Sequence, residues 1–140
     1  MKFLVDTNVI SELRKGARCD PNVSAWFASL PAEGLYLSVL VVGEIRRGIE
    51  NIRRRDPKSA RRLESWLKGL IAAHEDRILP VDRRVAEEWG RMNVPDPLPV
   101  LDGLMAATAK VNGLVLATRN VKDVARTPAR TVNPFAGAPS

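Results

Sequence analysis

Short apolar runs and amphipathic segments alternate along the chain. The first run stops abruptly at Asp6, and later runs cover residues 35–40, 78–81 and 114–118. Apolar runs of this length predict strands, and Pro80 places the third at an edge or at a strand end. Residues 131–134 predict one more short strand. Helical segments separate the strands, so we expect an α/β domain with a mostly parallel sheet of four or five strands in three layers, α/β/α.

The helical segments are marked by capping residues and by apolar spacing. Aspartate residues that favour a helix N-cap precede three of them, and two of these are followed by proline; we expect helices after Asp20, Asp56 and Asp82 and over residues 100–111. In the helix after Asp20, Trp26 and Phe27 belong to an apolar face and are expected in the core. We assign residues 1–134 to one domain and residues 135–140, rich in Ala, Gly, Pro and Ser, to a flexible tail.

Two acidic residues fall near the starts of predicted helices. Apolar residues recur at helical spacing from Val41 onward, which predicts a helix that begins close to Val41 and carries Glu44 in its first turn. Asp102 lies in the first turn of the helix over residues 100–111. The helix dipole favours an anion at both positions, so an ordinary first-turn role is the alternative interpretation.

Composition limits the kinds of site that the chain can hold. Among 140 residues there are one cysteine, Cys19, and one histidine, His74. An intrachain disulfide and a zinc site with several thiolates are therefore excluded, and a histidine-based site is disfavoured. The start of the chain has no secretory apolar segment, and no apolar run has the length of a membrane span, so we expect a cytoplasmic protein that does not enter a membrane.

The net charge of +6 is concentrated in one segment. Residues 46–62 contain eight basic and two acidic residues, so this segment carries the excess charge of the whole chain. A dense positive patch attracts the phosphates of nucleic acid, whereas a solvated arginine-rich helix face is the competing interpretation. As RNA-binding candidates we take Arg47, Arg53, Arg54, Arg55, Arg61 and Arg62.

Acidic and amide side chains follow several predicted strands. Asp6 follows the first, Glu44 the second, and Asn120 and Asp123 the fourth, while Asp102 begins a helix. Asp6 alone favours the interpretation of an ordinary turn residue. In a parallel sheet, however, the carboxyl ends of strands and the helix starts after them lie along one edge, so these side chains are expected to meet.

Carboxylates gathered at one edge favour a divalent cation, because the cation relieves their mutual repulsion. Oxygen ligands suit Mg²⁺ or Mn²⁺. Such a site activates a water and stabilises charge on a phosphodiester. An acidic site beside a basic patch therefore predicts cleavage of a nucleic-acid backbone.

Four segments in order resemble the PIN-domain family, in particular the VapC/FitB-type toxins of toxin–antitoxin pairs. They read LVDTNVISE from Leu4, LSVLVVGEIRRG from Leu37, DGLMAATA from Asp102 and ATRN from Ala117, and the terminal VNPF from Val132 extends the likeness. No single segment is specific, but the four together at these spacings are.

The resemblance implies a Mg²⁺- or Mn²⁺-dependent endoribonuclease with a three-layer α/β/α fold, usually a homodimer, that a small antitoxin protein inhibits. It implies that Asp6, Glu44 and Asp102 hold the metal and, with Asp123, carry catalysis. Some relatives have aspartate where this chain has Asn120, and others have asparagine there with aspartate three residues on. Either residue therefore completes the site. The polar residues expected to line the pocket are Thr7, Asn8, Ser38, Thr118 and Asn120.

Two other functions remain open at this point. One is a housekeeping nuclease of the same fold without an antitoxin. The other is a mainly binding role in a complex with antitoxin and operator DNA. Since the chain shows no helix-turn-helix, contact with operator DNA is expected only through the antitoxin.

Overall fold

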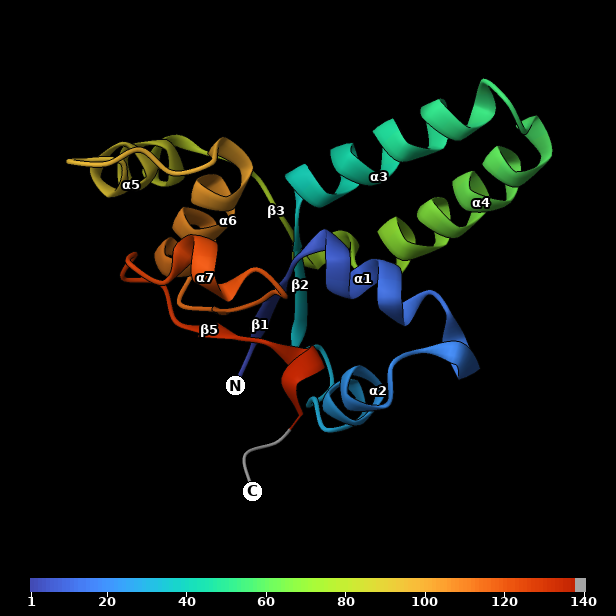
Figure 1. Ribbon diagram of the computed structural model, residues 1–140, viewed down its shortest axis with the longest axis horizontal. Coiled ribbons are helices and arrows are strands. Elements are labelled where there is room, and N and C mark those ends of the chain that lie inside the picture. Colours follow the sequence, from blue (N-terminus) through green and yellow to red (C-terminus); the bar gives the residue numbers. More distant parts are fainter. Residues whose placement is uncertain (138–140) are drawn as a thin grey trace.

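Five short parallel strands form a single sheet at the centre of the molecule. The structure is a computed structural model that describes residues 1–137 (Figure 1). Its strands run in the order β3-β2-β1-β4-β5 and are β1 (Phe3–Val5), β2 (Leu35–Ser38), β3 (Ile78–Leu79), β4 (Val115–Ala117) and β5 (Thr131–Val132). Leu4 of β1 pairs with Tyr36 on one side and with Leu116 on the other. The expected parallel sheet and the edge position of the third strand are confirmed.

Helices cover the sheet on both faces, as the strand–helix alternation predicts. On one side lie α1 (Thr7–Leu13), α3 (Val39–Arg53) and α4 (Pro57–Ala73), and on the other α5 (Arg83–Met92), α6 (Val100–Val111) and the short α7 (Val121–Val124) (Figure 1). The helix α2 (Pro21–Ala28) packs near the short 3-10 segment η3 (Pro134–Ala136). Two further 3-10 segments are η1 (Gly16–Arg18) and η2 (Glu75–Arg77). The fold class is therefore the expected three-layer α/β/α arrangement.

The capping signals in the sequence mark the helix starts. Asp20, Asp56 and Asp82 each accept hydrogen bonds from backbone N–H groups in the first turn of α2, α4 and α5. Two of these helices have proline at the first position, where no N–H is needed. The helix α6 has the bounds that the sequence predicts, and Gly113 follows it with a φ of 68°, a conformation that glycine adopts without strain.

Two details of the sequence prediction are wrong. The helix α3 begins at Val39, because Ser38 caps it with a hydrogen bond from the Leu40 N–H to Oγ. Glu44 therefore lies in the second turn, where the dipole argument made for it loses force. Phe27 is not in the core: its side chain is 48% exposed, whereas Trp26 packs edge-on against Phe3.

The C-terminal segment adds to the core before the end of the described residues. Phe135, which we assigned to the tail, packs against buried residues, and its backbone N–H is held by Asn133 Oδ1 at 3.0 Å. Residues 138–140 of the expected tail lie outside the part that the structure describes. Within residues 1–137, no helix is long and apolar enough to span a membrane.

Candidate active site

The carboxyl edge of the sheet gathers the four acidic residues expected there. Asp6 follows β1, Glu44 lies on α3 after β2, Asp102 starts α6, and Asp123 lies in the first turn of α7 after β4. Burial raises the pKa of the Asp102 carboxyl, and the negative charges of Asp123, Asp6 and Glu44 raise it further. Asp102 therefore lies close enough to the other three carboxylates for their charges to repel its own.

Asp6 is held in place by three hydrogen bonds. It is 8% exposed, and its backbone N–H donates to the Ala117 carbonyl of β4 at 2.9 Å. Its Oδ1 accepts a hydrogen bond from the Thr7 N–H at 2.8 Å and so caps α1. Its Oδ2 accepts a hydrogen bond from Thr118 Oγ1 at 2.7 Å, across 112 residues of sequence. The carboxylate of Asp6 thus caps α1 and at the same time lies at the carboxyl edge of the sheet.

Two threonines orient the neighbouring groups. Thr118, only 2% exposed, also accepts the Asn120 N–H at 3.0 Å, so one hydroxyl joins Asp6 to the loop before α7. Thr7 Oγ1 donates to Glu44 Oε1 at 2.7 Å and connects α1 to α3. Both oxygens of Asp6 and one oxygen of Glu44 thus accept a hydrogen bond, and their remaining lone pairs are left for a ligand.

Among the other polar residues expected at the pocket, Asn8 and Ser38 form hydrogen bonds within the protein, whereas Asn120 is exposed. Asn8 Oδ1 accepts the Arg119 N–H at 3.3 Å, and the fully buried Ser38 caps α3. Asn120 is exposed at the N-cap position of α7, where its side chain makes no capping bond. Asp123 is exposed as well. Both residues thus follow β4 at the carboxyl edge of the sheet and are accessible to solvent.

The helix that carries Asp102 is positioned by a close contact with α5. A Cβ atom on Gly103 would lie 3.1 Å from Cδ1 and 3.2 Å from Nε1 of Trp89. The indole ring therefore packs on the backbone of α6 at the residue after Asp102. A side chain at position 103 would push either the ring or the start of α6, which explains why glycine suits this position.

The residues present suit a hard divalent cation. All four candidate ligands are carboxylates, the donors that Mg²⁺ and Mn²⁺ prefer. Within residues 1–137, no three acidic, histidine or cysteine side chains are already grouped closely enough to hold an ion together. Mg²⁺ is commonly bound through one or two carboxylates with water completing its shell, so the chemistry of the donors fits a water-rich site.

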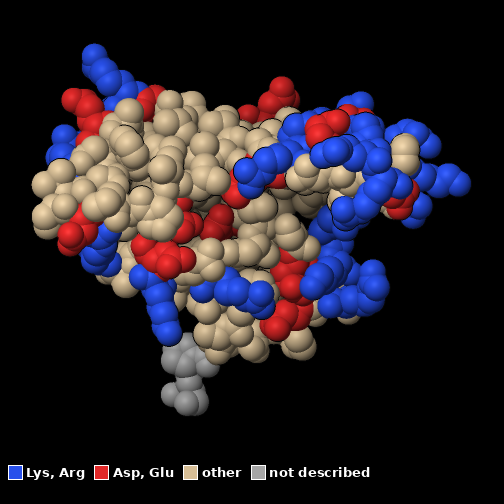
Figure 2. All heavy atoms as spheres, turned by 45° about the horizontal axis from the view of Figure 1, so that its top comes forward, with Lys and Arg blue, Asp and Glu red and all other residues tan. Residues whose placement is uncertain are grey.

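The basic residues lie on the hairpin of α3 and α4, next to the acidic edge. Figure 2 shows acidic side chains in the middle of one face, while Lys and Arg dominate the projecting end at the right. Arg46 and Arg53 form ion pairs with both Glu50 and Glu64, at 2.6 to 3.3 Å. The other five RNA-binding candidates are all exposed: Arg47, Arg54, Arg55, Arg61 and Arg62. Within residues 1–137, no acidic side chain lies within ion-pair distance of them.

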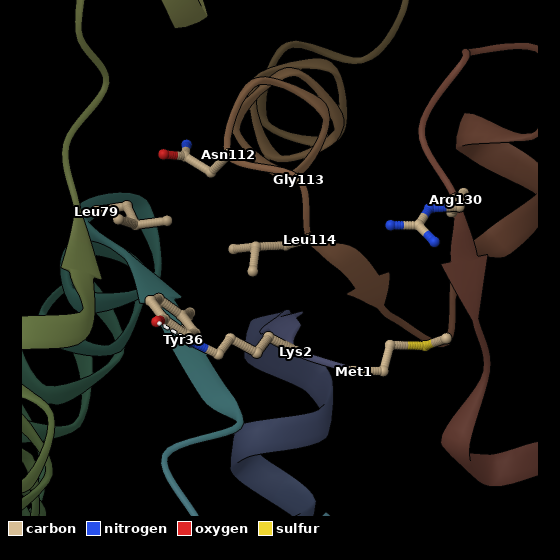
Figure 3. A pocket seen from close by; sticks show the side chains of 8 residues that line it. All are labelled: Met1, Lys2, Tyr36, Leu79, Asn112, Gly113, Leu114 and Arg130. Carbon is tan, nitrogen blue, oxygen red and sulfur yellow. Dashed lines mark hydrogen bonds between the residues drawn. The ribbon is translucent and has the colours of Figure 1, made fainter. Parts of the chain in front are cut away.

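A hollow of about 450 Å³ opens at the opposite edge of the sheet. Figure 3 shows that it is lined by residues at the amino ends of the strands, among them Lys2, Tyr36, Leu114 and Arg130. No carboxylate is among its eight lining residues. This hollow is thus separated from the acidic edge by the length of the strands.

One contact at the acidic edge was not foreseen from the sequence. The Arg119 guanidinium stacks on the Phe135 ring, with 3.8 Å from Cζ to the ring centroid. The position of Arg119 directly after Thr118 was the only signal, and the assignment of Phe135 to the tail concealed its partner. The contact places a cation one residue from the threonine that holds Asp6.

The structure is a parallel sheet with acidic residues at its carboxyl edge, and comparison with known proteins identifies the family. Residues 3–129 match the PIN domain. The chain therefore belongs to the PIN-domain family, and within it is related to proteins of the FitB and VapC type.

Relatives match over nearly the whole chain. Toxin FitB of Neisseria gonorrhoeae is 36% identical over 95% of this chain and 98% of its own length. VapC ribonuclease Y4jK of Sinorhizobium fredii is 32% identical over 95% of this chain and 97% of its own length. The crystal structure of FitAcB from Neisseria gonorrhoeae has a TM-score of 0.86 at 32% identity, covering 95% of this chain and 98% of that one. The structure of FitAB bound to an IR36 DNA fragment has a TM-score of 0.84 at 30% identity, covering 95% of both chains.

Proposed function

We propose that this protein is a Mg²⁺- or Mn²⁺-dependent endoribonuclease that acts as the toxin of a toxin–antitoxin pair. The observation that carries the proposal is the gathering of Asp6, Glu44, Asp102 and Asp123 at one edge of a PIN-domain sheet. The names of the relatives, a toxin and a VapC ribonuclease, support the choice of RNA as substrate.

Asp6, Glu44 and Asp102 would hold the metal, with Asp123 reaching it through water. When bound, a divalent cation offsets the repulsion among these carboxylates and stabilises the charge that develops on the phosphodiester. The oxygens of Asp102 and Glu44 Oε2 receive no hydrogen bond from residues 1–137, so they are available to a ligand or to a water. Thr118 and Thr7 hold Asp6 and Glu44 in fixed orientations and limit their reorganisation.

The protein's own residues would prepare the attack on the phosphodiester by orienting water. Asp123 and Asn120 are accessible to solvent at the carboxyl edge of the sheet, where each can accept a hydrogen bond from a water molecule. Asp123 can in addition take up a proton as water attacks phosphorus. Asn120 cannot take up a proton, so its role is restricted to orientation.

The exposed arginines of the α3–α4 hairpin would bind the RNA backbone. Arg47 lies one turn after Glu44 on the same helix, so a strand held at this arginine runs toward the carboxylates. Arg54, Arg55, Arg61 and Arg62 extend the positive surface toward the far end of the hairpin. Arg53 contributes less, because Glu50 and Glu64 already share its charge.

The partners are proposed on the basis of the relatives. A small antitoxin, encoded beside this protein, would inhibit it and would carry any contact with operator DNA; the FitAB structure with a DNA fragment supports this arrangement. We also propose a cytoplasmic homodimer. Val94 in the loop before α6 and Val100 at its first position are 75% and 60% exposed, and they offer apolar surface that a second copy can cover.

The test is RNA cleavage by the purified protein, with and without its antitoxin. We expect cleavage of total RNA with Mg²⁺, no cleavage in EDTA, and inhibition by the product of a short adjacent reading frame. Cleavage without any such neighbouring gene would favour the housekeeping nuclease. No cleavage, together with antitoxin-dependent binding of operator DNA, would favour the binding role.

A further inference from the structure

We propose that Arg119, stacked on Phe135, is a binding residue for an RNA phosphate next to the scissile bond. The inference rests on the proposed ribonuclease function and adds a residue that binds substrate at the acidic edge. It is carried by the geometry of one guanidinium, which is fixed in position while its hydrogen-bonding edge stays free.

The backbone around Arg119 is anchored at three consecutive amides. The Thr118 N–H donates to the Val132 carbonyl at 3.0 Å, the Arg119 N–H to Asn8 Oδ1 at 3.3 Å, and the Asn120 N–H to Thr118 Oγ1 at 3.0 Å. The middle residue of this segment is therefore held at the carboxyl edge of β4. Its neighbour Thr118 contacts Asp6, so the distance from Arg119 to the catalytic edge is fixed by the backbone.

The side chain of Arg119 is held as well. Its Cζ lies 3.8 Å from the centroid of the Phe135 ring. The backbone of Phe135 is held, because its N–H donates to Asn133 Oδ1 at 3.0 Å and its carbonyl accepts Asn22 Nδ2 at 2.9 Å, and the residue packs against the core. A stacked guanidinium loses less conformational freedom when it binds a ligand than a freely moving side chain does.

The hydrogen-bonding edge of Arg119 remains available. The guanidinium lies over the Phe135 ring, and its five N–H donors lie in the plane of the group. The side chain is exposed, and within residues 1–137 no carboxylate or carbonyl accepts a hydrogen bond from it. Planar N–H donors of this kind match two oxygens of a phosphate. The positive charge of Arg119 adds slightly to the lowering of the pKa of Glu12, which is caused mainly by the Asp20 N–H and Lys15. These two groups already donate hydrogen bonds to the oxygens of Glu12.

The location of Arg119 agrees with a neighbouring phosphate rather than with the scissile one. The side chain extends from the β4 edge toward η3, whereas the four carboxylates converge over α3, α6 and α7. A backbone bound at Arg119 would pass beside the acidic site next to α1, whose Asn8 and Glu12 lie close to Arg119. Arg119 and the arginines of the hairpin would then hold the RNA backbone at two separate points near the cleavage site.

The test compares Arg119→Gln with Arg14→Gln. Arg14 is a matched control, because its guanidinium also lies over an aromatic ring, Trp66, at 5.6 Å, but at the far end of α1. The probe is a fluorescent single-stranded 2′-O-methyl oligoribonucleotide that resists cleavage. For Arg119→Gln we expect roughly tenfold weaker binding at low salt and a salt slope lower by about 0.7. Arg14→Gln should bind as the wild type does.

A cleavage assay on short RNA separates binding from chemistry. Arg119→Gln should raise KM by the same factor as the dissociation constant while kcat changes less than twofold, since the contact is made in both ground and transition states. Phe135→Leu should show a smaller rise in KM, because it removes the stacking but not the charge. Arg119→Lys should fall between the wild type and Arg119→Gln.

Three results would overturn the inference. Unchanged probe binding and KM in Arg119→Gln would show that the cation only fixes the C-terminal segment. A lower melting temperature without a change in KM would show the same. Unchanged KM with weaker inhibition by the antitoxin would assign the residue to a protein partner. If the wild type binds the probe but cleaves no RNA, the proposed ribonuclease function fails, whereas the binding comparison still decides the role of Arg119.

Discussion

Removal of the Thr118 hydroxyl tests the hydrogen bonds at the carboxyl edge of the sheet most sharply. Valine has nearly the shape of threonine, so Thr118→Val deletes the 2.7 Å bond to Asp6 Oδ2 and the 3.0 Å bond from the Asn120 N–H without opening a cavity. A bond to a charged carboxylate contributes about 1.5–3 kcal/mol and a neutral one about 1 kcal/mol. Because Asn120 is exposed, water replaces part of the second bond.

We therefore expect Thr118→Val to lower the free energy of unfolding by about 3 kcal/mol and the melting temperature by roughly 10 °C. Cleavage should fall about 10- to 100-fold, since a carboxylate that loses its orienting partner holds a metal less well. Thr118→Ser is the control: it keeps the hydroxyl, and the loss of one methyl group costs about 1 kcal/mol. Calorimetry and an RNA cleavage assay measure both effects. Equal melting temperatures for the two variants, or wild-type cleavage by Thr118→Val, would refute the reasoning.

The remaining predictions concern charge. Asp102→Asn should abolish cleavage yet raise the melting temperature at neutral pH in EDTA. Because the folded state raises the pKa of Asp102, wild-type stability falls as pH rises from 3.8 through the raised pKa. The gain in melting temperature should therefore vanish in acid. Asp123→Asn should reduce kcat less than Asp6→Asn does, since an interaction through water contributes less than a direct one; equal loss would make Asp123 a direct ligand, and no effect would transfer its role to Asn120. The last change replaces five exposed arginines with glutamine: Arg47, Arg54, Arg55, Arg61 and Arg62. It should raise KM for RNA and lower the salt slope by about 0.7 for each arginine that binds a phosphate. Unaltered RNA affinity at low salt would exclude this surface as the RNA-binding site.

Local signals in the sequence were sufficient for most of the fold. The Asp-Pro pairs and Asp82 marked three helix starts, and the last long helix had its predicted bounds, because capping and helical spacing act within a few residues. The start of α3 was predicted two residues too late. An unbroken apolar run from residue 39 to 42 suits either a strand or a helix, and Ser38, its only marker, was counted within the strand.

The placement of the acidic residues at one edge of the sheet was also predictable, but the hydrogen bonds that hold them were not. The strand–helix alternation places Asp6, Glu44, Asp102 and Asp123 along one edge whatever the details of packing. In contrast, the bond from Thr118 to Asp6 joins residues 112 positions apart, and Thr7 binds Glu44 across 37 positions. Hydrogen bonds of this kind depend on side-chain geometry, so periodicity carries no signal for them.

The measurement that tests the central claim most directly is the binding of Mn²⁺ by titration calorimetry, without RNA. We predict saturable binding to the wild type and its loss in Asp6→Asn. Asp56→Asn, which removes one carboxylate from the cap of α4 at the far end of the hairpin, should bind Mn²⁺ as the wild type does. Equal binding by Asp6→Asn and the wild type, or no binding by the wild type, would contradict the assignment of a metal site to the carboxyl edge of the sheet.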